Sequence, residues 1–186
     1  MEIRILIDDE ALERIIRRAL EQVQGGRTAA SPAWRAYLVN CSRPADLLRV
    51  VEAPDTTAPG IRAEPHWRVL QEVARGDVLL FRDARRKAIV GHARAERREI
   101  GTHRHQSRTP ALRWWLAEAV TYDPALPDPE FIQIFKARQR TSPGFRLLRQ
   151  NNAYAQKAYI YPLDPEVLQA VIAKVGAPDP GAPSAS

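Results

Sequence analysis

The chain of 186 residues is poor in cysteine and has no long hydrophobic run. Its single cysteine, Cys41, excludes an internal disulfide and is typical of a reducing cytoplasm. No apolar stretch approaches the roughly 20 residues that are needed to cross a bilayer. Residues 1–16 become acidic too early for a secretory signal, and they lack a small-residue cleavage site. We therefore expect a soluble, cytoplasmic protein with no membrane partner.

The common motifs of catalysis and cofactor binding are also missing. The sequence contains no phosphate-binding P-loop, no GxGxxG and no CxxC pair. It has no Glu-x-Lys, which argues against the usual core of a Mg²⁺-dependent restriction nuclease. His103 and His105 are closely spaced, but no third ligand at metal-site spacing accompanies them. The sequence therefore predicts a protein that is not an enzyme and needs no cofactor or metal.

Positive charge is the first feature that is present in excess. Lys and Arg number 28 against 22 Asp and Glu, a formal net charge of +6. Residues 82–108 hold nine basic and three acidic residues, an excess equal to that of the whole chain. Such clustering is typical of phosphate binding, and its alternative is an Arg-rich solvated surface. The residues expected to bind phosphate are Arg85, Arg86 and Lys87 at a hairpin tip, then Arg97, Arg98, Arg104 and Arg108, with Arg146 and Arg149 extending the surface.

Hydrophobic periodicity divides the chain into three parts. Apolar residues at three- and four-residue spacing predict an amphipathic helix over residues 9–24. We expect residues 1–33 to form this helix and a connector, residues 34–175 the main domain, and residues 176–186 a flexible tail or linker. The apolar stripe of the first helix needs a cover, either the domain or a partner subunit.

Within the main domain the expected elements alternate between strands and helices. A short helix over residues 45–51 is followed by an irregular loop over residues 52–65, and a helical turn over residues 69–73 precedes the Gly76-Asp77 corner. Residues 101–110 read as a polar loop, and Pro124, Pro127, Pro129 and Pro162 as strand ends. The predicted strands cover residues 36–40, 78–82, 88–96, 113–122 and 158–161, and the later helices cover residues 131–138 and 165–174.

The stretch HWRVLQEVARGDVLLFRDARRKAIVGHARA, residues 66–95, together with the later FRLLRQ and AYIYPL, resembles the EVE domain. That family belongs to the PUA-like superfamily, with the YTH and ASCH domains, and the resemblance covers about residues 35–173. It implies an α+β fold, a partly closed mixed β-barrel of five or six strands flanked by helices. The predicted N-terminal helix would be an addition to it.

The resemblance also implies a function. EVE-like domains are often the N-terminal recognition modules of modification-dependent (type IV) restriction systems. The implied role is a non-catalytic reader of double-stranded DNA that binds a flipped base, either methylated or hydroxymethylated cytosine or N6-methyladenine. A motor or nuclease would then be fused or associated. Two other interpretations stay open, an RNA-binding PUA-like module and a protein-interaction or dimerisation module.

In PUA-like readers the base pocket lies at the end of the first strand and in the loop that leads to the Gly-Asp corner. On this sequence the resemblance points to Asn40, Cys41, Ser42 and Trp67. An amide both donates and accepts, which suits Asn40 to reading a base edge, although an asparagine here can equally cap a turn. Trp67 either faces the pocket or packs in the core.

The pocket has fewer aromatic residues near it than in related domains, because residues 42–65 contain none. An aromatic cage would have to be completed by Trp114, Trp115 or Tyr122. Adjacent tryptophans on a strand face opposite sides of the sheet. One of Trp114 and Trp115 therefore belongs to the core, and the other faces a groove or a partner.

Overall fold

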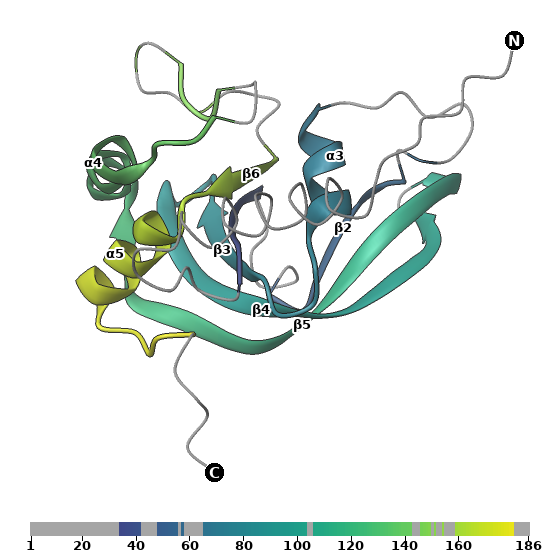
Figure 1. Cartoon of the computed structure of the whole chain (residues 1–186), viewed down its shortest axis with the longest axis horizontal. Coiled ribbons are helices and arrows are strands. Elements are labelled where there is room, and N and C mark those ends of the chain that lie inside the picture. The colour runs from purple at the N-terminus through teal and green to yellow at the C-terminus, as the bar shows by residue number, and fades with distance from the viewer. Residues whose placement is uncertain are drawn as a thin grey trace, which may run out of the picture. The chain divides into compact units, whose positions relative to one another are not determined.

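The computed structural model describes residues 34–41, 48–55, 57, 65–103, 106–142, 146–149, 151, 154 and 159–180. All of them belong to one compact unit, Trp34–Ser186 (Figure 1). The predicted helix over residues 9–24 lies outside the described residues. Within the described part of the chain, no helix is long and apolar enough to cross a membrane.

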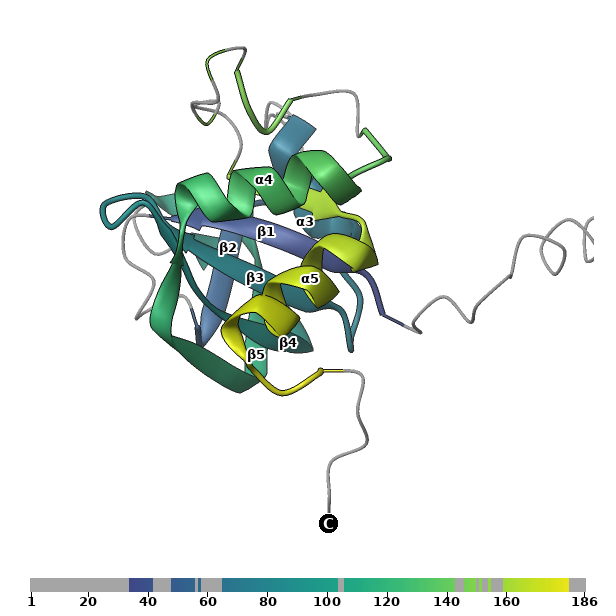
Figure 2. The same cartoon turned by 90° about the vertical axis from the view of Figure 1, so that its left-hand side faces the viewer.

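Six strands form one mixed sheet in the order β2-β5-β4-β3-β1-β6, in which β1 and β3 run parallel and the other neighbours antiparallel. The sheet curls into a half-barrel, with the three helices of the described residues against it (Figures 1 and 2). The strands are β1 Ala36–Cys41, β2 Val50–Pro54, β3 Val78–Asp83, β4 Ala88–His103, β5 Gln106–Pro127 and β6 Ile160–Leu163, and the helices are α3 Pro65–Glu72, α4 Asp128–Arg138 and α5 Pro165–Val175. This is the PUA-like α+β architecture that the resemblance implies.

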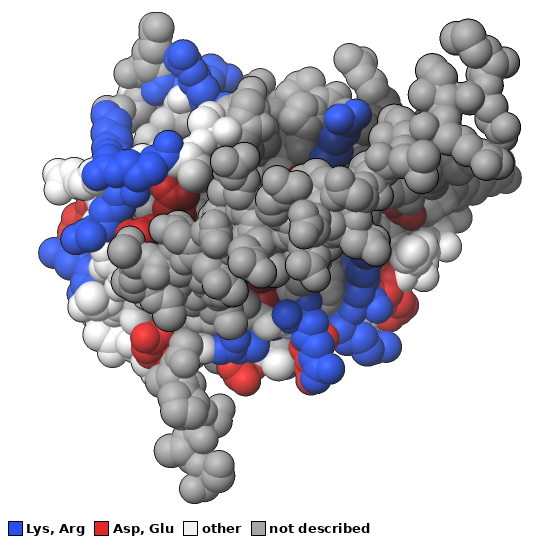
Figure 3. Space-filling view, in the orientation of Figure 1, with Lys and Arg blue, Asp and Glu red and all other residues white. Residues whose placement is uncertain are grey.

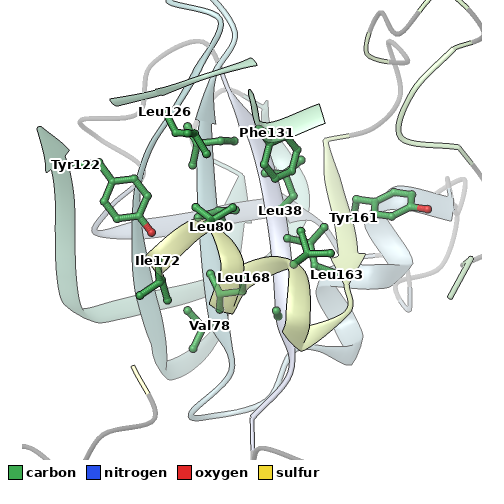
Figure 4. Packing of buried hydrophobic residues seen from close by; sticks show 14 of the residues in the cluster. Leu38, Val78, Leu80, Tyr122, Leu126, Phe131, Tyr161, Leu163, Leu168 and Ile172 are labelled. Atoms are coloured by element: carbon green, nitrogen blue, oxygen red, sulfur yellow. The ribbon is translucent and has the colours of Figure 1, made fainter. Parts of the chain in front are cut away.

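Both faces of the central strands β1 and β3 are buried. Alternate residues, such as Leu38 and Leu80, pack against α4 and α5 in one apolar cluster (Figure 4). Their neighbours, such as Val39 and Phe81, pack on the other face against α3 and the curled strands β2, β4 and β5. Because neither face meets water, both strands read as unbroken apolar runs in the sequence.

The Gly76-Asp77 corner joins α3 to β3. Gly76 has a φ of 92°, a conformation that favours glycine. The buried Asp77 carboxylate accepts hydrogen bonds from the backbone N–H groups of Ala74 and Arg35, at 2.8 and 2.9 Å, and pairs with the Arg35 guanidinium. This corner therefore fixes the start of β3 against the start of β1.

Several predicted bounds of helices, loops and strands are wrong. The helix predicted over residues 45–51 and the loop predicted over residues 52–65 overlap β2, which pairs with β5. The predicted polar loop over residues 101–110 overlaps the ends of β4 and β5, which pair as one long hairpin. Pro124 and Pro162 lie inside strands, whereas Pro127 is the last residue of β5, as predicted.

Helix α5 agrees with the prediction. It begins at Pro165 after the N-cap residue Asp164, and Gly176 ends it with a left-handed φ of 68°.

Candidate nucleic-acid interface

Asn40 lies where β1 ends, beside Arg82 on the parallel neighbour β3. The backbone N–H of Asn40 donates to the Tyr159 carbonyl at 2.7 Å, which holds the residue between two segments. Its side-chain Oδ1 accepts a hydrogen bond from Arg82 Nη1 at 2.7 Å. Because a guanidinium only donates, it must face the oxygen of the carboxamide. The Asn40 NH₂ group is thereby turned away from Arg82 as an oriented donor, and no residue that the structure describes accepts a hydrogen bond from it.

Arg82 is only 6% exposed, and its charge is compensated inside the protein. Its Nε and Nη2 donate to the two carboxylate oxygens of Asp128, the first residue of α4, with the Nε contact at 2.9 Å. Burial alone would lower the pKa of Arg82, but the hydrogen bonds and charge of Asp128 outweigh it and raise the pKa. Arg82 therefore orients Asn40 and is not free to bind phosphate.

Tyr154 packs against Arg82. Its ring lies under the Arg82 guanidinium, with the Arg82 Cζ 3.7 Å from the ring centroid, a cation–π contact. Burial raises the pKa of the Tyr154 hydroxyl, which lies beside Asp128 and Arg82. The buried hydroxyl nevertheless makes no well-aligned hydrogen bond within the described part of the chain. We call Asn40, Arg82, Asp128 and Tyr154 the Asn40 corner.

The other residues predicted at the end of the first strand are placed differently. Cys41 is buried, and its thiol donates to the Arg82 carbonyl at 3.3 Å. Its thiol is therefore directed toward the backbone of the neighbouring strand β3. Ser42 lies outside the described residues.

The four candidate aromatic residues do not converge on one site. Trp67 is half-buried on α3 and packs against the same apolar cluster as the buried Trp114, whose Nε1 donates to the Leu70 carbonyl at 3.3 Å. Trp115 faces the opposite side of β5, where its Nε1 donates to Glu99 at 2.7 Å. Tyr122 is buried in the other cluster, against α5. Trp67 and Trp115 are therefore the candidate rings with exposed surface.

The predicted phosphate-binding residues also separate in space. Arg85, Arg86 and Lys87 are exposed in the β3–β4 turn, where Asp83 accepts the N–H groups of Arg85 and Arg86 and leaves their side chains outside. Further along β4, the two neighbouring arginines contact different partners: Arg97 lies 5.3 Å from the Trp115 ring centroid, and Arg98 donates to Gln71 at 3.2 Å. Arg104 and the side chain of Arg108 lie outside the described residues.

Buried His92 is a titratable group that the sequence does not single out. Its Nδ1 lies 2.8 Å from the Tyr122 hydroxyl, and burial, with a smaller contribution from Arg94, lowers its pKa to about 4. Elsewhere in the described chain, no three His, Cys, Asp or Glu side chains gather as a metal site. His103 and His105 have side chains outside the described residues, so the predicted absence of a metal stays a prediction.

Comparison with known proteins adds a set of solved structures. No family model and no curated protein matches the sequence. Similar structures include a variant of ZmASCH from Zymomonas mobilis (11% identity, 77% of this chain and 98% of that chain covered, TM-score 0.49). The human THYN1 protein, in complex with 5-methylcytosine-containing DNA, gives 14% identity, 78% and 99% coverage and a TM-score of 0.47.

The N-terminal domain of Staphylothermus marinus McrB gives 8% identity, 75% and 93% coverage and a TM-score of 0.49. All three are thus covered almost completely by this chain, at very low sequence identity.

Proposed function

We propose that this chain is a non-catalytic reader of a modified base in duplex DNA, with Asn40 contacting the edge of the extruded base. The observation that supports this proposal is the orientation of the Asn40 carboxamide. Its oxygen is held by a buried and compensated arginine, so that its NH₂ group is a fixed donor at the end of β1. A fixed donor suits the acceptor atoms N3 and O2 of cytosine, and N1 of N6-methyladenine.

The energetics of base reading set what the site must supply. Extruding a base from a duplex costs a few kcal/mol. Stacking on an aromatic ring returns roughly 1–3 kcal/mol per base, and a buried methyl group adds only about 0.8 kcal/mol. Hydrogen bonds to the base edge must therefore contribute to affinity, and a pre-oriented donor contributes without the entropic cost of being ordered on binding.

The half-buried Trp67 is the stacking residue in this proposal, since the buried Trp114 and Tyr122 would have to leave the core to reach a base. The resemblance to EVE domains suggests a role in modification-dependent restriction and antiphage defence. In that role residues 176–186 would link the reader to a motor or nuclease, and residues 1–33 would precede it.

The test is a titration of the wild-type chain against matched duplexes. One strand carries cytosine, 5-methylcytosine, 5-hydroxymethylcytosine or N6-methyladenine at a single position, and an RNA hairpin serves as the alternative ligand. The proposal predicts tighter binding to one marked duplex, with a preference that persists at high salt because it does not arise from phosphate contacts. Equal affinity for all DNA duplexes would contradict it, and preferential binding to the hairpin would favour an RNA-binding module.

A further inference from the structure

A second positive surface lies outside the segment that the sequence analysis emphasises. From Phe131 to Leu163 the chain has six basic residues and no acidic residue. Five of the six belong to the described chain, and each is exposed. They are Lys136 and Arg138 in the last turn of α4, Arg140 directly after it, and Arg146 and Arg149 in the segment beyond. Lys and Arg side chains gather in this region at the upper left of Figure 3.

These five cations are not neutralised by carboxylates in the way that those of β4 and β5 are. Within the described residues none of the five forms an ion pair, and the backbone N–H of Arg140 donates to the buried Asp164. By contrast, Arg94 pairs with Glu118 at 2.8 Å, and Arg97 lies 3.7 Å from Glu99. Acidic and basic side chains accordingly lie next to one another along the lower edge of Figure 3.

The start of α4 adjoins the Asn40 corner. The Asp128 N–H donates to the Lys87 carbonyl at 2.9 Å, so the start of α4 is attached to the β3–β4 turn that carries Arg85 and Arg86. Asp128 also binds Arg82 in the Asn40 corner. The cations lie in the last turn of α4 and in the segment after it, whereas the first turn of α4 carries Asp128 and Glu130.

We propose that α4 and the segment after it bind the phosphodiester backbone of a nucleic-acid duplex next to the Asn40 corner. An anionic membrane fits this surface less well, because interfacial binding needs exposed apolar side chains beside the charges. In the described chain the large hydrophobic residue that is exposed is Ile100, on β4 and not on α4. The position of the backbone relative to a read base rests on the proposed function, but the backbone contact itself does not.

The experiment compares two variants that lose the same charge. The first is Arg146→Gln with Arg149→Gln; the control is Arg49→Gln with Arg75→Gln, two exposed arginines before β2 and β3. Affinity for an unmarked DNA duplex, and for an RNA duplex of the same sequence, is measured over a salt series. Each lost phosphate contact lowers the slope of log K against log salt by about 0.9. The first variant should lose about two units of slope, and the control should keep the wild-type slope.

Equal slopes for the two variants would overturn the proposal, as would an unchanged slope in the first. A slope change seen with the RNA duplex alone would identify the backbone as RNA. The ratio of affinities for marked and unmarked DNA separates this proposal from the proposed function. A wild-type protein with no such preference, but with the predicted slope change, would disprove base reading and leave the phosphate surface standing. Circular dichroism of both variants checks that α4 remains folded.

Discussion

At the scale of single residues, the Asn40–Arg82–Asp128 arrangement is the feature on which the account depends. Sequence analysis singles out Asn40 and counts Arg82 only as one of nine cations. In the structure Arg82 orients Asn40 and does not bind phosphate, because Asp128, 46 positions away, neutralises it in a buried ion pair. No local sequence pattern predicts this ion pair, because it forms only when the start of α4 packs beside the end of β3.

Removing one partner of this pair should be costly. In Asp128→Ala the Arg82 guanidinium stays buried without its counterion, and such changes typically destabilise proteins by about 3–5 kcal/mol. The double variant Arg82→Met with Asp128→Leu removes both charges and should be less destabilised than Asp128→Ala alone. Urea unfolding measures both free energies. An Asp128→Ala protein as stable as wild type would show that the pair is not buried as described.

His92 predicts how stability depends on pH. Its pKa in the folded protein is lowered to about 4 from an ordinary value of 6.5, so the unfolded chain binds more protons between these values. The free energy of unfolding should therefore fall as the pH drops from about 6.5 to about 4, by up to about 3 kcal/mol from this group. Unfolding curves of wild type and His92→Gln across this range isolate the contribution. Parallel pH profiles for the two proteins would contradict the assignment.

At the scale of elements, sequence analysis locates the buried strands well and the paired hairpin poorly. Strands β1 and β3 are evident because both of their faces are apolar. The ends of β4 and β5 are polar, and they form strands because they pair with each other. The strand propensities of single residues do not include this pairing. Prolines mislead for the same reason: Pro162 lies on the edge strand β6, and Pro124 where the β4–β5 register shifts, both positions that tolerate a missing N–H.

Gly91 permits a close approach of β4 and β5. A Cβ at this position would lie 2.3 Å from the Val120 carbonyl oxygen, a backbone atom that cannot swing aside. Gly91→Ala should therefore destabilise the fold, by about 2 kcal/mol or more, as overpacked sites do. Gly101→Ala on the same strand is the control, because its Cβ would meet side-chain atoms of Arg113 and Glu99 and no backbone atom among its three nearest neighbours. Similar denaturation midpoints for both variants would refute this role for Gly91.

At the scale of the whole molecule, the basic residues that cluster between positions 82 and 108 of the sequence lie apart from one another in the fold. Nine residues of β4 separate Lys87 from Arg97, an extended length of about 30 Å, and several arginines between residues 82 and 108 are paired with acids. The surface on α4 arises instead from a stretch without acids, a signal that is present in the sequence and that counting basic residues alone overlooks. The resemblance anticipates the PUA-like fold, but not which aromatic residues are exposed.

The candidate site could be predicted from the sequence only where it depends on local features. Asn40 and the β3–β4 turn follow from strand ends and turn chemistry, which are local. The burial of Trp114 and Tyr122, and the attachment of α4 to the β3–β4 turn, follow only from the three-dimensional arrangement of the sheet and its helices. Of the predicted pocket residues, Asn40 and Trp67 are the two that the proposed function uses.

The most direct test of base reading is the ratio of affinities for marked and unmarked duplexes in Asn40→Ala and Asn40→Asp. The aspartate keeps an acceptor for Arg82 but has no N–H to donate, and Gln133→Ala, an exposed amide on α4, is the control. We expect both Asn40 variants to lose about fivefold or more of the preference, the equivalent of one neutral hydrogen bond, while binding to unmarked DNA persists. An unchanged ratio in both Asn40 variants would show that Asn40 does not read the base.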